Sequence, residues 1–234
     1  MIFGIILASG FGTRMGETEK PKQFLMLGDK PVLIHTIEKF SIINDFDEII
    51  VLTPKEWINH TKDLIKKHIP TNNITVIPGG ELRIDSVNEG MEYIIQHYGN
   101  DEHIIVTHDA VRPFVTHRII KENIIKAEKF GACNTLIPSS DTIVESIDSE
   151  IISNIPNRSY MYQGQTPQSF KLNKLKIFYD KLTNDEKIKL TDACKLFVAN
   201  GEEVAIVKGE EYNIKITYTY DLKVANCILK GDFK

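Results

Sequence analysis

The chain begins with an apolar run, IFGIILA over residues 2–8, that leads into a glycine-rich stretch, SGFGTRMG over residues 9–16. The run is typical of a buried parallel strand, because strands covered on both faces are apolar without alternation. Glycines just past the end of a strand let the backbone turn tightly and bring bare amide groups close to a ligand. Arg14 and Lys22 add two positive charges beside that turn. We therefore expect a polyphosphate site at the end of the first strand.

Two common glycine-rich phosphate motifs do not fit this stretch. A dinucleotide fingerprint needs G-x-G-x-x-G opening directly into a helix, whereas Gly16 comes one position late and a polar segment follows it. A Walker loop needs Gly-Lys-Ser/Thr, which the stretch lacks. The glycines alone also fit a purely structural turn. The added Arg14 and the tripeptide Pro21-Lys22-Gln23 favour the phosphate site.

Strand-like and helix-like segments alternate along the rest of the chain. The expected strands cover residues 48–52, 74–77, 104–107, 131–138 and 203–207. The expected helices cover residues 31–42, 56–68, 83–97, 118–130, 172–182, 192–200 and 220–229. This alternation predicts an α/β fold, Rossmann-like and doubly wound around a mostly parallel sheet, in one domain over residues 1–234. Ligands of such sheets bind beyond the carboxyl ends of the strands.

One segment interrupts this alternation. Residues 142–147 and 151–155 are predicted to form two short strands around a tight turn. Such an inserted hairpin is either an edge decoration or an arm that reaches a partner. Residues 162–170, YQGQTPQSF, close this region, and their polar side chains, glycine and proline predict a shaped loop.

Composition excludes several classes of protein. The 234 residues are 42% hydrophobic and 26% charged, which is ordinary for a soluble globular protein. A formal net charge of −4 argues against general nucleic-acid binding. Three scattered cysteines without C-x-x-C spacing indicate reduced thiols in a cytoplasmic protein. No stretch approaches 18 apolar residues, so no membrane span is expected.

A second glycine turn precedes a predicted helix in GGELRIDSV, residues 79–87. A helix start with free amide groups, together with Arg83 and Ser86, is suited to a base, a ribose or a phosphate. A plain capped helix start fits the same pattern.

The stretch THDAVRP, residues 107–113, follows a predicted strand. Asp109 is a candidate to hold Mg²⁺, directly or through water, or a ribose hydroxyl, and Arg112 is a candidate phosphate contact. A structural Asp–Arg pair is the alternative. His108 is expected to pack or to hydrogen-bond, because no second histidine has ligand spacing. Further on, Lys215 interrupts a strand-like alternation over residues 213–217.

In their order along nearly the whole chain, these motifs resemble those of the 2-C-methyl-D-erythritol 4-phosphate cytidylyltransferases. The matching motifs are LASGFGTRMG (7–16), PKQ (21–23), GGxxRxxSV (79–87), HDAVRP (108–113), QTPQ (165–168), TDA (191–193) and NIK (213–215). Three stretches look more like the branch that loads ribitol 5-phosphate and makes CDP-ribitol for teichoic acid or capsule polymers. They are VTHDAVRPF (106–114), YQGQTPQ (162–168) and DLKVAN (221–226).

The resemblance implies an enzyme that joins CTP and D-ribitol 5-phosphate to give CDP-ribitol and pyrophosphate, with Mg²⁺ bound mainly through the CTP phosphates. The implied nucleotide-binding residues are Leu7, Ala8, Ser9, Gly10, Gly80, Glu81, Leu82, Arg83, Ile84, Asp85 and Ser86. The implied catalytic residues are Arg14, Lys22, Arg158 and Lys215, and the implied substrate contacts are Asp109, Arg112 and Thr142, with Asp109 also the candidate metal ligand. A homodimer is implied too, in which a β-arm at about residues 140–166 completes the neighbour's site.

Two positions depart from the family pattern. Ser9 stands where glycine or alanine is usual, and Ile84 stands where a polar residue is more common. Neither change removes a charged residue, so they affect the fit of the base edge more than activity.

Three other functions fit the sequence less well. The nearest is 2-C-methyl-D-erythritol 4-phosphate cytidylyltransferase of isoprenoid synthesis, or CTP transfer to another polyol phosphate. A pyrophosphorylase for another sugar and nucleotide is disfavoured by the short chain and by the motif at residues 79–87. An inactive nucleotide-binding regulatory subunit is disfavoured because the charged residues are retained.

Overall fold

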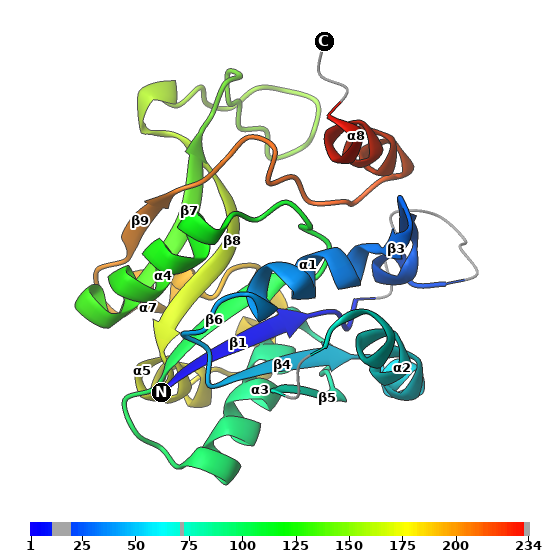
Figure 1. The fold of residues 1–234 in the computed structure, drawn as a ribbon. Coiled ribbons are helices and arrows are strands. Elements are labelled where there is room, and N and C mark those ends of the chain that lie inside the picture. Colours follow the sequence, from blue (N-terminus) through cyan, green and yellow to red (C-terminus); the bar gives the residue numbers. More distant parts are fainter. Residues whose placement is uncertain (11–19, 71–72, 232–234) are drawn as a thin grey trace.

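The apolar runs of the sequence form the strands of one central sheet (Figure 1). The structure, a computed structural model, describes residues 1–10, 20–70 and 73–231. Over these residues the sheet has seven strands in the order β5-β4-β1-β6-β8-β7-β9. Their bounds are β1 (Ile2–Leu7), β4 (Glu48–Thr53), β5 (Ile74–Pro78), β6 (Ile104–Asp109), β7 (Ala132–Pro138), β8 (Tyr162–Lys171) and β9 (Ala205–Lys208). The strand prediction is therefore confirmed for every expected strand outside residues 140–166 and 213–217.

The strands β5, β4, β1 and β6 are parallel, and β1 lies at their centre. In register, Ile5 of β1 lies opposite Ile50 of β4 and Thr107 of β6. Successive side chains of a strand point to opposite faces of the sheet. In β1, Phe3 and Ile5 accordingly pack in one hydrophobic cluster and Ile6 packs in the other. Covering both faces explains why this strand is apolar throughout.

Helices cover both faces of the sheet, as the doubly wound prediction requires (Figure 1). One layer contains α1 (Val32–Ser41), α2 (Ile58–His68) and α4 (His117–Phe130). The other contains α3 (Arg83–Tyr98), α5 (Leu172–Asp180) and α7 (Cys194–Ala199). The remaining helical segments are η2 (Lys22–Phe24), η3 (Lys55–Trp57), η4 (Arg158–Tyr160), α6 (Asn184–Lys189) and α8 (Thr219–Lys230), and β2 (Met26–Leu27) pairs with β3 (Lys30–Pro31). No helix of the described residues is long and apolar enough to cross a membrane.

The largest difference from the sequence-based prediction is β8. Its residues had the glycine, proline and polar side chains of a shaped loop, yet they form a strand antiparallel to both β6 and β7. Its central residues are buried although many are polar, including Gln165, Gln168 and Ser169. Conversely, residues 213–217 do not form the expected strand; they run as an extended segment tied to the loop after β6 by the Ile216 amide, which donates to the Val111 carbonyl at 2.9 Å.

The predicted hairpin is wrong in its detail. Residues 142–155 contain one isolated antiparallel bridge, between Glu145 and Asn154, in place of two strands. The tight turn is present, because the Asp148 carboxylate accepts the amide protons of Glu150 and Ile151 at 3.0 and 2.9 Å. A two-stranded ribbon without apolar cover is marginal in water, so the pairing does not extend further.

Candidate active site

A pocket of about 420 Å³ lies at the carboxyl ends of β1 and β6. It is lined by Leu7, Ala8, Ser9, Gly10, Lys22, Gln23, Glu81, Leu82, Arg83, Asp109, Ala110, Val111 and Lys215. Five separate stretches of the chain thus meet where parallel α/β sheets bind their ligands.

A buried amide joins the first turn to the segment that carries Lys22. Gln23, which is 2% exposed, donates from Nε2 to the carbonyl of Ala8 at 2.6 Å. Because Gln23 follows Lys22 directly in η2, this bond fixes the lysine beside the end of β1. The motif Pro21-Lys22-Gln23 therefore contains a positioning residue as well as a cation.

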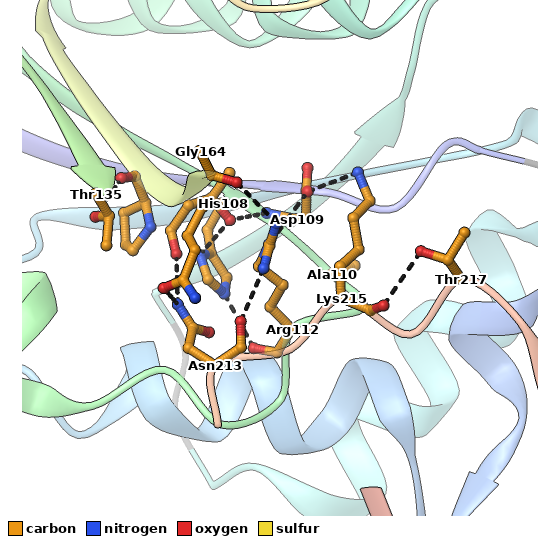
Figure 2. Close-up of polar contacts among 12 residues, drawn as sticks. His108, Asp109, Ala110, Arg112, Thr135, Gly164, Asn213, Lys215 and Thr217 are labelled. Carbon is orange, nitrogen blue, oxygen red and sulfur yellow. Dashed lines mark hydrogen bonds and ion pairs between the residues drawn. The ribbon is translucent and has the colours of Figure 1, made fainter. Parts of the chain in front are cut away.

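Asp109 lies at the centre of a cluster of positive charges (Figure 2). Its carboxylate is 2.8 Å from Lys215 Nζ, 3.3 Å from Arg83 Nε and 3.6 Å from Arg112 Nε. Burial alone would raise the pKa of Asp109, but Arg83, Lys215 and Arg112 outweigh it and hold this pKa well below its usual range. Three positive groups against one carboxylate leave a surplus of two charges, which suits an anionic ligand.

His108 fixes the turn that carries this cluster. Its side chain is fully buried, and Nδ1 accepts from the Thr166 hydroxyl at 2.9 Å while Nε2 donates to the Arg112 carbonyl at 3.1 Å. The same Thr166 oxygen accepts the Asp109 amide at 3.1 Å. Burial lowers the pKa of His108 to about 4, so the imidazole is neutral at pH 7 and serves both bonds. The expectation of a hydrogen-bonding histidine is confirmed.

Arg112 is more deeply buried than expected for a residue that only contacts a phosphate. Its Nη1 donates to the Asn213 carbonyl at 2.8 Å, and the residue is 9% exposed (Figure 2). Asn213 in turn donates to Gln165 Oε1 at 3.1 Å and to the Thr166 carbonyl at 3.0 Å. These bonds hold the segment that brings Lys215 to Asp109. The Asp–Arg pair considered as the structural alternative is thus present.

The structure brings together most of the predicted site residues. Those that line the pocket are Leu7, Ala8, Ser9, Gly10, Lys22, Glu81, Leu82, Arg83, Asp109 and Lys215. Next to it, in the second glycine turn and its helix start, lie Gly80, Ile84, Asp85 and Ser86. Thr142 and Arg158 do not line the pocket; they lie in the segment around the bridge, where Arg158 Nη1 donates to the Ser140 carbonyl at 3.0 Å. Arg14 lies outside the described residues.

Gln168 is a site residue that the sequence analysis did not single out. Its Oε1 accepts from Arg83 Nη2 at 3.4 Å, and its Nε2 donates to Asp192 Oδ2 at 2.7 Å. Asp192 also accepts the Cys194 amide at 2.7 Å, which confirms its predicted place at a helix start. The sequence motif QTPQ, residues 165–168, contains this glutamine. Its role became visible only in the structure, where the buried strand β8 places Gln168 beside Arg83.

The residues present do not build a metal site of their own. Among the described residues, no group of three or more histidine, cysteine or acidic side chains is placed to hold an ion. Asp109 fits the role of a direct ligand poorly, because three cations already surround its carboxylate and would repel a divalent ion. Any such ion must therefore rely mainly on oxygens of the ligand.

The described residues thus place a pocket lined by residues 7–10 and 81–83, together with a cationic cluster, at the carboxyl edge of an α/β sheet. Residues 2–231 match the family model described as 2-C-methyl-D-erythritol 4-phosphate cytidylyltransferase, IspD. The chain belongs to this family. It is therefore a CTP-dependent cytidylyltransferase, within the nucleotidyltransferases, and enzymes of this family generally use a divalent cation.

Solved structures agree with this assignment. The chain is 31% identical to a 4-diphosphocytidyl-2C-methyl-D-erythritol synthase from Anaerococcus prevotii, with a TM-score of 0.82 over 98% of this chain and 96% of that one. It is 27% identical to the 2-C-methyl-D-erythritol 4-phosphate cytidylyltransferase of Francisella tularensis, with a TM-score of 0.80 over 96% and 98%. The Thermus thermophilus enzyme, at 24% identity and a TM-score of 0.75 over 98% and 100%, shares the fold.

Proposed function

We propose that this chain transfers the cytidylyl group of CTP to a polyol phosphate and releases pyrophosphate. The observation that carries the proposal is the pocket that joins both glycine turns to the cations around Asp109. The first turn and the 80–86 segment hold CTP. Lys215 and Arg158 orient the acceptor phosphate, and Asp109 and Arg112 contact the rest of the acceptor.

The reaction is an in-line attack of the acceptor phosphate on the α-phosphorus of CTP. The second pKa of a phosphate monoester is about 6, so the nucleophile is ionised at pH 7 and no general base is needed. The barrier comes from bringing two anions together, and catalysis consists of positioning and charge neutralisation. Lys22 and Arg14 neutralise the triphosphate. A divalent cation, when bound, would be held mainly by the phosphate oxygens of CTP and would supply further charge neutralisation there.

Two acceptors have support. The family and the relatives above are named for 2-C-methyl-D-erythritol 4-phosphate, so the comparisons favour this acceptor over the ribitol 5-phosphate expected from the sequence. Ribitol 5-phosphate, with CDP-ribitol as the product for cell-wall polymers, rests on the three stretches at residues 106–114, 162–168 and 221–226. Both compounds carry a phosphate on a short polyhydroxy chain and require the same cationic cluster.

A pyrophosphate-release assay with CTP and each of these phosphates separates the two acceptors. We expect one of them to give a kcat/KM at least tenfold above that of the other. The alternative nucleotides ATP, GTP and UTP serve as controls for the base. Absence of pyrophosphate release with every polyol phosphate tested would contradict the proposal and favour a regulatory nucleotide-binding subunit.

The chain works as one domain over residues 1–234, in the cytoplasm, and as a homodimer. The segment at about residues 140–166 exposes a set of large apolar side chains, namely Val144, Ile147, Ile151, Ile152 and Ile155. Ile147 is 88% exposed, which is costly for an isolated chain in water. Burying these side chains on a second copy brings Thr142 and Arg158 to the neighbour's pocket.

A further inference from the structure

The two glycine turns are joined by a pair of serine hydroxyls. Ser9 Oγ, at the end of the first strand, lies 2.7 Å from Ser86 Oγ in the first turns of α3. Ser9 lines the pocket, whereas Ser86 is fully buried. This bond crosses the end of β4, which lies between β1 and β5 in the sheet.

Ser86 lies at the centre of several hydrogen-bonding groups of the second turn. Its oxygen accepts the Gly80 amide proton at 3.1 Å and lies 3.3 and 3.2 Å from the carbonyl oxygens of Gly80 and Leu82. Either hydroxyl can donate in the bond between Ser9 and Ser86, because each serine carries one proton and can also accept. In both directions the bond gives the buried Ser86 hydroxyl a partner from the first turn.

The packing around Gly79 shows that the two turns are in close contact. A Cβ atom on Gly79 would lie 2.5 Å from Ser9 Cβ and 2.9 Å from Ser9 Oγ. Distances this short are not tolerated, so glycine is required wherever the first turn carries a serine at position 9 in this orientation. Backbone bonds hold both sides in place, because the Ala8 amide donates to Leu52 and the Gly79 amide donates to Thr53.

We propose that Ser9 is a positioning residue for CTP, and that it acts by tying the first glycine turn to Ser86 and the second turn. The inference rests on the proposed nucleotide site, since both turns form walls of that pocket. When the two turns are already held in place, CTP binding does not have to order them, and its entropic cost is lower. Loss of the hydrogen bond between Ser9 and Ser86 therefore weakens CTP binding. In the proposed function the acceptor phosphate is held by Lys215 instead, so its binding does not depend on Ser9.

The test measures the dissociation constant of CTP by calorimetry, without any polyol phosphate, for Ser9→Ala, Ser86→Ala and the double variant. We expect Ser9→Ala to weaken CTP binding about three- to tenfold, the contribution of one neutral hydrogen bond. In the Ser86→Ala background the same change has little further effect, because the partner is already gone. Gly79→Ala displaces Ser9 and gives a loss at least as large.

Ser169→Ala is the matched control. Its hydroxyl is also fully buried and donates to Asn123 Oδ1 at 3.1 Å, but the residue does not line the pocket. We expect this variant to bind CTP like the wild type. In steady-state assays, Ser9→Ala raises KM for CTP and leaves kcat and KM for the polyol phosphate within twofold.

Two results would overturn the role of Ser9: CTP affinity unchanged within twofold in Ser9→Ala and in Ser9→Gly, or fully additive losses in the double variant. If the wild type binds CTP but uses no polyol phosphate, the proposed function fails while the role of Ser9 is still decided by calorimetry. If the wild type does not bind CTP, both fail.

Discussion

The pocket and the segment at residues 140–161 differ in whether their side chains find partners within the same chain. Around the pocket, Asp109 is 6% exposed and three cations of the same chain neutralise it. In the segment, one isolated bridge joins Glu145 and Asn154, and large apolar side chains are exposed, with Ile147 88% exposed. Figure 1 shows this segment as a loop that lies beyond the end of β7. In the first region the buried charge is paired within one chain, whereas in the second region apolar side chains stay exposed, which supports the proposed contact with a second copy.

This difference separates the predicted site residues into two groups. Lys22, Asp109 and Lys215 are held by the core of their own chain. Arg158, in contrast, is held by a backbone carbonyl of the same exposed segment. The experiments below test whether the two groups belong to one site, and how rigidly the core holds the first group.

The largest effect is expected from the cations beside the first turn. Lys22→Ala and Arg14→Ala each remove a charge that, in the proposed function, neutralises the triphosphate, and kcat should fall about 10²- to 10³-fold, as for loss of a preorganised oxyanion donor. A steady-state assay of pyrophosphate release measures this fall in kcat. Lys30→Ala is the control, because Lys30 pairs with Glu38 outside the pocket. Near-wild-type rates for either variant would remove that residue from the mechanism.

Complementation between variants tests whether Arg158 acts on the neighbouring subunit. Arg158→Ala and Lys22→Ala are each expected to be inactive as homodimers. When they are mixed after unfolding and refolding, half of the dimers are mixed, and in these one of two sites has both residues. About a quarter of wild-type activity should therefore return in a twofold-symmetric dimer. Activity no higher than that of the separate variants would show that Arg158 does not act in trans.

Loss of the Asp109 charge should destabilise the core. In Asp109→Asn, the groups of Arg83, Arg112 and Lys215 lose their common anion, which should cost about 3 kcal/mol in the free energy of unfolding. Urea denaturation at pH 7 measures it. Because the folded pKa of Asp109 is lowered, its stabilisation is complete above pH 4 and is lost only at more acidic pH. Equal stability of wild type and variant at pH 7 would mean that the cluster adds nothing to folding.

The smallest expected effect is the pH dependence due to His108. Its pKa is lowered to about 4 in the folded state, against 6.5 when unfolded, so between these values the unfolded chain binds more protons. Stability therefore falls as the pH falls, by about 2 kcal/mol from pH 7 to pH 5. His108→Gln should lose this part of the pH dependence, as measured by urea denaturation at both pH values. The same slope in wild type and variant would assign it to other groups.

Local pattern was sufficient for much of the fold. Apolar runs without alternation identified β1, β4 and β6, and helical periodicity identified the helices that cover them, because burial on both faces or on one stripe leaves its mark in adjacent residues. β8 was missed because its pattern of polar residues and proline is that of a loop. Its strand exists only because β6 and β7 supply partners on both sides.

The candidate site, like the fold, has features that local sequence predicted and features that only the tertiary structure decided. Residue types and spacing predicted a phosphate turn at residues 9–16, a second turn at 79–87 and the charged residues Asp109 and Lys215, because each motif has a local chemical meaning. Of the first turn, residues 11–16 lie outside the described residues, so its phosphate role stays a prediction. Tertiary structure alone decided that three cations surround Asp109, that Gln168 joins Arg83 to Asp192, and that Ser9 contacts Ser86. Such contacts join residues up to 106 positions apart, as Asp109 and Lys215 are, and they depend on strand order and register, which adjacent residues do not encode.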